Sequence, residues 1–160
     1  MPFAVPGAEG DPQERAALAR ALQDARVPLE QGLAASAREG TPISAKYEID
    51  NGKFQLSVYT MKDDGFHEVI VDHATGEISK AFLITDGADL DAARKQKDVL
   101  AFAKRTLEAA TAEAVKNNAG YRAVSAMPLL TDGRSIVDVI LTNGQDWKTV
   151  RRPLTDDDYY

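Results

Sequence analysis

Leucines recur at helical spacing in two segments near the start of the chain. They fall four residues apart, at Leu18 and Leu22 and again at Leu29 and Leu33. This spacing places each pair on one face of a helix. Asp11 precedes the first segment as an N-cap, Pro28 opens the second and Gly40 is placed to end it. The pattern predicts a short N-terminal helix over 11–25 and a second helix that ends at Gly40.

From residue 41 the period changes to two, which is typical of strands. The runs "ISAKYEI", "KFQLSVYTM" and "FHEVIVD" are rich in β-branched and aromatic residues and are separated by Asn51-Gly52 and Asp64-Gly65. Both dipeptides are hairpin signals. "ATGEISKAFLI" adds a fourth strand after a turn. The sequence therefore predicts a four-stranded antiparallel meander.

The segment 85–96 is expected to be a connector, with Asp89 or Asp91 as the N-cap of the next helix. The run "DVLAFAKRTLEAATAEAVKNNAG" then predicts one long helix, whose apolar stripe includes Val99, Phe102 and Leu107. Strand-like residues return in "YRAVSAMPLL", "RSIVDVILT" and "DWKTVRRPL". Pro128 donates no ladder hydrogen bond, so the first of these strands is expected at a sheet edge, or with a bulge, where it could accept a strand of a partner.

The two halves of the chain look like copies. Ser44 and Ser125 lie 81 positions apart, as do the turns at Asn51 and Asp132, and a deletion in the hairpin would place the third strands 80 apart. We therefore predict an α+β fold of two tandem helix-plus-antiparallel-β-meander units packed together, with a short N-terminal helix. The expected divisions are a flexible arm (1–10), the N-terminal helix (11–25), a first unit (27–84), a connector (85–96), a second unit (97–154) and an acidic tail (155–160).

Composition narrows the classes of function. The net charge is −6 and the sequence pI is about 4.9, which disfavours sequence-independent nucleic-acid binding and adhesion to anionic membranes. The chain has no cysteine, so disulfides and thiolate metal sites are excluded. No apolar run approaches the ~20 residues that span a bilayer, so we expect no direct membrane insertion.

The residues that could carry chemistry do not form a known catalytic pattern. "HEVIVDH" fails the zinc-peptidase signature because Val71 stands where the second histidine is required. Ser135 in "GRSIV" lacks the second glycine of a nucleophile elbow. We therefore predict a protein that is not an enzyme and has no catalytic, metal or cofactor-binding residues.

Two groups of residues are candidate interaction surfaces. Trp147 precedes Arg151 and Arg152 in one strand and would form a basic-aromatic strip, residue types that are enriched at interface hot spots. In the alternative interpretation, which we favour, Trp147 closes the hydrophobic core and the arginines face water. Tyr47 and Tyr59 are placed on one exposed face of the sheet, or against the second unit.

The stretch "VDHATGEI" closes the first unit and carries a resemblance. Together with the preceding helix and strands, from Val27 onward, it resembles a PepSY domain, whose closing motif is matched by Val71, Asp72, Thr75, Gly76, Glu77 and Ile78. Asp72 and Thr75 are expected to bind backbone N–H groups in a turn, with Gly76 at positive φ, Glu77 opening the next strand and His73 exposed. Residues 97–152 look like a degenerate second copy, with Arg152 where Asp72 would align.

PepSY domains occur in propeptides of thermolysin-like metallopeptidases and in many secreted, periplasmic or membrane-attached bacterial proteins, and tandem copies are similar to β-lactamase-inhibitor-like folds. The resemblance implies a non-enzymatic binding protein, periplasmic or secreted, that binds a protein partner. We expect a peptidase inhibitor or modulator that acts by occlusion. The alternative is a sensory module that binds a small ligand in the groove between the two units.

Overall fold

The computed structural model describes residues 11–63 and 65–155, which contain four α-helices and one seven-stranded antiparallel sheet. The helices are α1 (Pro12–Leu22), α2 (Leu29–Ser36), α3 (Gly87–Leu100) and α4 (Leu107–Lys116), and a 3-10 turn, η1 (Ala37–Glu39), follows α2. The strands are β1 (Thr41–Asp50), β2 (Lys53–Lys62), β3 (Gly65–Val71), β4 (Ile78–Leu83), β5 (Arg122–Thr131), β6 (Arg134–Thr142) and β7 (Trp147–Pro153). The predicted arm (1–10), residue 64 of the second hairpin and residues 156–160 of the predicted tail lie outside the described residues.

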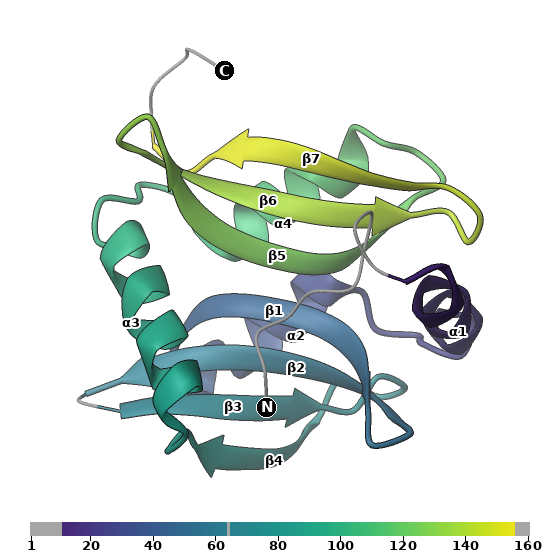
Figure 1. Cartoon of the computed structure of the whole chain (residues 1–160), viewed down its shortest axis with the longest axis horizontal. Helices are drawn as coiled ribbons and strands as arrows, with labels where there is room; N and C mark the ends of the chain where they lie inside the picture. The colour runs from purple at the N-terminus through teal and green to yellow at the C-terminus, as the bar shows by residue number, and fades with distance from the viewer. Residues whose placement is uncertain (1–10, 64, 156–160) are drawn as a thin grey trace.

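The sheet has the order β4-β3-β2-β1-β5-β6-β7 (Figure 1). Strands β1–β4 form a first meander, strands β5–β7 form a second meander, and the two meet where β1 pairs with β5. The α+β fold class, with two helix-plus-meander units and a short N-terminal helix, is therefore confirmed. The N-cap at Asp11 is present as well, since its side chain accepts a hydrogen bond from the N–H of Gln13 at 2.9 Å.

The seam between the two meanders is short. Only two residue pairs join β1 to β5, Ala45 with Ala126 and Lys46 with Ser125, and beyond them the two strands diverge (Figure 1). Pro128, two residues past the seam, has no N–H with which to extend the pairing. The sequence predicted that β5 lies at a sheet edge or carries a bulge. It lies between β1 and β6 in the strand order, but its register with β6 shifts between Ala123 and Ser125, and past Ala126 it pairs with β6 alone.

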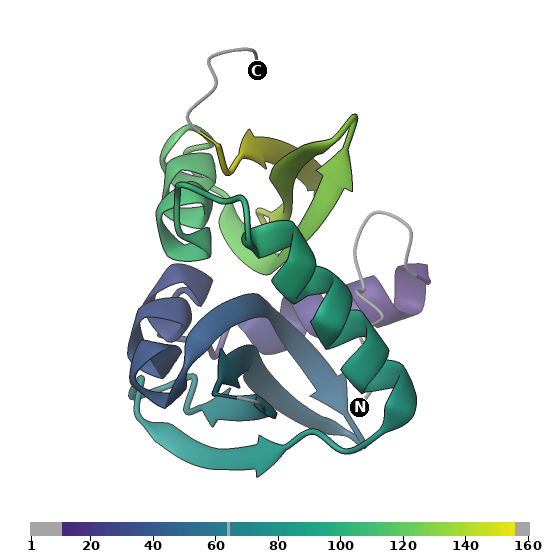
Figure 2. The ribbon, with the colours of Figure 1, turned by 90° about the vertical axis from the view of Figure 1, so that its left-hand side faces the viewer.

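Helices α2 and α4 lie side by side on one face of the sheet, which we call the helix face (Figure 2). Their buried leucines pack on alternate residues of the strands in one continuous core, which includes Leu29, Leu33, Leu56, Val58, Leu107, Val137 and Val139. At Gly32 the approach is close, since a Cβ there would lie 2.7 Å from Leu56 Cδ2. We call the opposite face of the sheet the polar face.

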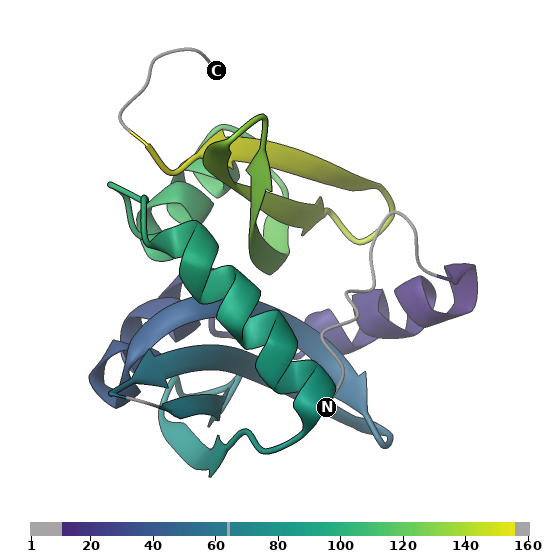
Figure 3. The same ribbon diagram turned by 60° about the vertical axis from the view of Figure 1, so that its left-hand side comes forward.

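Helix α3 bridges the two halves of the molecule (Figure 3). It begins earlier than predicted, because Asp86 is its N-cap and accepts hydrogen bonds from the N–H groups of Ala88 and Asp89. The predicted connector is thus largely helical, and neither Asp89 nor Asp91 is the cap. The single long helix is also wrong: Thr106 caps a new helix, and Phe102, expected in the apolar stripe, is 72% exposed.

The strand registers of the two meanders correspond. Val58 pairs with Val69 in the first meander, and Val139 pairs with Val150 in the second. Both members of this pair are shifted by 81 positions, so the expected offset of 80 for the third strands is wrong. By this register Arg152 corresponds to Val71, and Pro153 corresponds to Asp72.

Candidate binding site on the first meander

The two tyrosines predicted on an exposed face are both buried, on opposite faces of the sheet. Tyr47 stacks on Phe54 in the helix-face core, with ring centroids 5.5 Å apart, and burial raises its pKa to about 12. Tyr59 belongs instead to a small cluster under α3. The expectation that the two tyrosines share an exposed surface is therefore wrong.

The predicted basic-aromatic strip does not form, because Arg151 and Arg152 are successive residues of β7 and point to opposite faces. Arg151 donates two hydrogen bonds to the Asp138 carboxylate, at 2.9 and 3.2 Å. Arg152 lies on the helix face and pairs with Glu113 of α4. Trp147 is half-buried and packs against the main core, in agreement with the alternative interpretation, although the arginines form ion pairs instead of simply facing water.

The turn after β3 has the geometry expected of its residues. Asp72 Oδ1 accepts hydrogen bonds from the N–H groups of Ala74 and Thr75, at 2.8 and 3.1 Å, and these bonds hold the pKa of Asp72 below its usual value. Thr75 Oγ1 accepts a hydrogen bond from the N–H of Glu77, and Gly76 has a φ of 83°. Glu77 lies just before β4, which begins at Ile78.

The same turn holds the chain that leads into α2. The carbonyl of His73 accepts hydrogen bonds from the N–H groups of Arg26 and Val27, at 2.8 and 3.0 Å. The His73 ring is half-buried and lies 4.8 Å from the ring of Phe54, so the expectation that it is exposed is wrong. The turn motif therefore has a structural role, which is to fix the entry to the helix.

The second unit contains an equivalent contact without the motif. The carbonyl of Leu154 accepts hydrogen bonds from the N–H groups of Lys104 and Arg105, at 2.6 and 3.1 Å, just before α4. Leu154 is fully buried. The two units therefore share the hydrogen bonds that hold the chain before α2 and α4, and they differ in the turn that supplies the accepting carbonyl.

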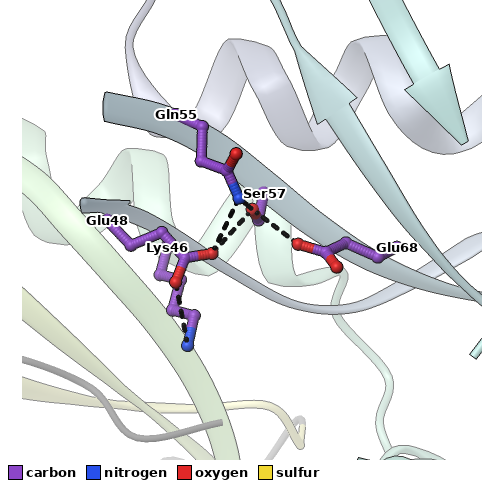
Figure 4. Close-up of polar contacts among 5 residues, drawn as sticks. All are labelled: Lys46, Glu48, Gln55, Ser57 and Glu68. Atoms are coloured by element: carbon purple, nitrogen blue, oxygen red, sulfur yellow. Dashed lines mark hydrogen bonds and ion pairs between the residues drawn. The ribbon is translucent and has the colours of Figure 1, made fainter. Parts of the chain in front are cut away.

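The sequence-based predictions missed a cluster of polar side chains on the polar face of the first meander, formed by Lys46, Glu48, Gln55, Ser57 and Glu68 (Figure 4). Lys46 and Glu48 are 2% and 7% exposed. Their side chains form an ion pair with Nζ and Oε1 3.7 Å apart. Ser57 Oγ lies between the two carboxylates, 2.9 Å from Glu48 Oε2 and 3.0 Å from Glu68 Oε2.

Burial dominates the electrostatics of this cluster. It lowers the pKa of Lys46, against the carboxylates of Glu48 and Glu68, which raise it. It raises the pKa of Glu68, against the hydrogen bond from Ser57, which lowers it. Moving charged groups out of water costs free energy that their pairing only partly offsets. We therefore expect this cluster to contribute little or nothing to the stability of the fold.

The second meander shows that the fold does not require the cluster. The residues 81 positions further on are Met127 for Lys46, Leu129 for Glu48, Asp138 for Ser57 and Thr149 for Glu68. An apolar pair thus stands where the first meander has a buried ion pair. We therefore regard the cluster as the candidate functional site.

A hollow of about 320 Å³ adjoins the cluster through Gln55 and Glu68. Its remaining lining residues are Asp50, Asn51, Lys53, Ile70, Ser79, Lys80 and Phe82. It thus lies between the β1–β2 hairpin and the edge strand β4. The site combines a charged cluster with an open strand edge.

One sequence signal for this site was present. Lys46 and Glu48 flank the buried Tyr47, so opposite charges two residues apart share the face that Tyr47 does not use. Glu68 comes from another strand, and its place depends on the β2–β3 register. The cluster could therefore be anticipated only in part.

Comparisons with known proteins found only a distant similarity to a solved structure. No protein-family model matches it, and no curated protein matches it. A crystal structure described as that of a "putative lipoprotein" from Clostridium difficile 630 is similar, at 18% identity and a TM-score of 0.45, over 84% of this chain and 90% of that chain. The resemblance to PepSY domains thus has no family match behind it.

Within residues 11–63 and 65–155, no group of three or more histidine, aspartate or glutamate side chains is arranged to hold a metal ion. None of the helices in this part of the chain is long and apolar enough to cross a membrane.

Proposed function

We propose that the chain is a non-enzymatic binding protein of the bacterial envelope or exterior, built from two tandem PepSY-like units, that occludes the cleft of a peptidase. The equal strand registers and the two matching helix entries support the tandem arrangement. The observation that carries the binding role is the open edge of β4 beside the charged hollow.

Within residues 11–63 and 65–155, no strand pairs with the outer edge of β4. The N–H of Ile84 donates to the carbonyl of Phe66, and the β3–β4 register continues this ladder through Phe82 and Lys80. By alternation, the N–H and C=O groups of Ala81 and Leu83 point away from the sheet. Phe82 and Leu83 are also 50% and 60% exposed, so an added strand would find both hydrogen bonds and apolar contacts.

The other edge of the sheet is less available. Pro153 of β7 has no N–H to offer, and Arg151 and Arg152 of the same strand are held by Asp138 and Glu113. An extended segment of a partner, such as a loop at the rim of a cleft, is therefore expected to pair with β4.

The alternative, a sensory module, would bind its ligand between the two units. The hollows of about 540, 350 and 320 Å³ are lined by residues of the first unit and α3. They lie away from β6 and β7, so these hollows support a surface on the first meander better than a groove between the units.

Inhibition of a peptidase tests the proposal. The chain is titrated into a thermolysin-like metallopeptidase secreted by the same organism, and we expect activity to fall linearly to a 1:1 equivalence while the chain stays intact. Ala81→Pro removes an outward N–H and should weaken inhibition about tenfold; Ala81→Thr keeps the N–H and should inhibit normally. Full activity at excess chain, or equal inhibition by both variants, would contradict the proposal.

A further inference from the structure

The hydroxyl group of Ser57 makes three polar contacts, with Gln55, Glu48 and Glu68. Its hydroxyl oxygen lies within 3.0 Å of a carboxylate oxygen of Glu48 and of Glu68, and accepts a hydrogen bond from Gln55 Nε2 at 3.2 Å. A serine hydroxyl has one hydrogen and two lone pairs. With both glutamates ionised, one of the two oxygen–oxygen contacts would contain no hydrogen. All three contacts are satisfied when Ser57 donates to one glutamate and the other, protonated, donates to Ser57.

The proton belongs on Glu68. Glu48 faces the ammonium group of Lys46 and the amide of Gln55, at 3.7 and 3.3 Å, and both favour its ionised form. For Glu68, burial raises the pKa above its usual value.

The groups that surround Glu68 come from four elements. They are Lys46 and Glu48 on β1, Ser57 and Tyr59 on β2, Lys80 on β4, and Asp89 on α3, which faces Lys46 and Tyr59. Lys46 and the hydrogen bond with Ser57 favour the ionised form of Glu68, whereas Glu48 and burial favour its neutral form, and burial is the largest of these effects.

A neutral Glu68 changes the net charge of the residues that line the hollow from zero to plus one. The charged groups that remain in the lining are Lys53, Lys80 and Asp50, a net positive charge of one in a chain of net charge −6. Ile70 and Phe82 supply apolar wall. Such a lining suits an anionic group on a partly apolar segment.

We propose that this hollow binds the carboxylate of an acidic side chain in an extended peptide, with Lys53 and Lys80 as its cationic partners and neutral Glu68 beside them. The path of the peptide rests on the proposed pairing with β4, whose Lys80 and Phe82 side chains line the hollow. Binding of the carboxylate in the hollow can be tested separately from this pairing.

Three peptides serve as probes, each acetylated, amidated and of the pattern Thr-Val-Thr-X-Thr-Val-Thr, with X as Glu, Gln or Lys. Their affinities for the full chain are measured by calorimetry. We expect the Glu peptide to bind about tenfold more tightly than the Gln peptide, since each exposed ion pair contributes roughly threefold, and the Lys peptide to bind most weakly. Equal affinities would overturn the carboxylate site alone, whereas no binding by any peptide would overturn the β4 path as well.

Variants then test the role of Glu68. Above about pH 5.5 the peptide carboxylate stays ionised. There the affinity of the wild type should fall as the pH rises and Glu68 ionises. Glu68→Gln is neutral at every pH and can still donate to Ser57, so its affinity should stay at the low-pH value. Weaker binding by a folded Glu68→Gln variant would overturn the proposal.

Changes of charge in the lining complete the test. Asp50→Asn should tighten binding of the Glu peptide about threefold, and Lys80→Gln should weaken it by a similar factor. Lys95→Gln, on an exposed position of α3 outside the lining, should leave it unchanged. Binding that responds equally to Lys80→Gln and Lys95→Gln would show a non-specific charge effect and contradict the site.

Discussion

Replacing the buried ion pair by its counterpart from the second meander tests whether the fold needs it. Lys46→Met and Glu48→Leu introduce the residues found at Met127 and Leu129, 81 positions away. Both native side chains are almost fully buried on the polar face. The second meander holds Met127 and Leu129 in a strand of corresponding register. We therefore expect the first meander to accept the same two residues.

The single change Lys46→Met and the double change are expected to differ in their effect on the free energy of unfolding. Lys46→Met leaves Glu48 buried without its cation, and removal of one partner of a buried pair costs about 3–5 kcal/mol. Glu48 keeps its hydrogen bonds to Gln55 and Ser57, so we expect the lower end, about 3 kcal/mol, or roughly 6–12 °C in Tm. The double variant should lie within about 1 kcal/mol of the wild type or above it, because apolar replacements of buried pairs are often neutral or stabilising.

Urea unfolding followed by circular dichroism measures all four proteins. The coupling free energy between the two positions should be at least about 2 kcal/mol. If the double variant is as unstable as Lys46→Met alone, the fold requires the ion pair, and its presence cannot be attributed to binding.

Three further outcomes are expected. Gly76→Ala should lower the free energy of unfolding by about 1–2 kcal/mol in urea, because φ is 83° there and a Cβ would lie 3.0 Å from Gln31 Nε2. Spectroscopic titration of tyrosine should show one group that ionises only near pH 12, and Tyr47→Phe should remove it. Because its pKa is raised in the folded state, Glu68 should stabilise the wild type relative to Glu68→Gln most at low pH. This advantage should disappear as the pH rises through the folded-state pKa, and a constant difference in Tm from pH 4 to 8 would contradict it.

Much of the sheet could be predicted because its turns are local. Asn51-Gly52 and Asp132-Gly133 adopt positive φ at both positions, as two-residue hairpins require. The first of these turns also implies the register of β1 and β2, in which Tyr47 faces Leu56. Tyr59, three residues beyond Leu56, must then point to the opposite face, so the error about a shared tyrosine surface was avoidable.

The helical connection was harder to predict. The run from Asp98 to Gly120 has no proline and is rich in alanine, so propensity favours one continuous helix. The capping bond of Thr106 and the bonds from Lys104 and Arg105 to the Leu154 carbonyl instead stop and restart the helix. That acceptor lies about fifty positions away, and tertiary contacts of this kind override local preference.

The candidate site depended on the same kind of non-local information. Lys46 and Glu48 were visible as a same-face pair, but Glu68 joins them only through the pairing of β3 with β2. The exposed edge of β4 depends on the order of all seven strands.

The paired N–H groups before α2 and α4 are built-in probes of two distant chain segments. The amides of Arg26 and Val27 can exchange with solvent hydrogen only when the turn at His73 opens, and those of Lys104 and Arg105 only when Leu154 leaves its place. Native-state exchange at these four amides would therefore report separately on the opening of each unit. A chain cut after Pro153 would lose protection at Lys104 and Arg105 while it kept protection at Arg26 and Val27, so Leu154 marks the shortest C-terminal boundary that preserves both helix entries.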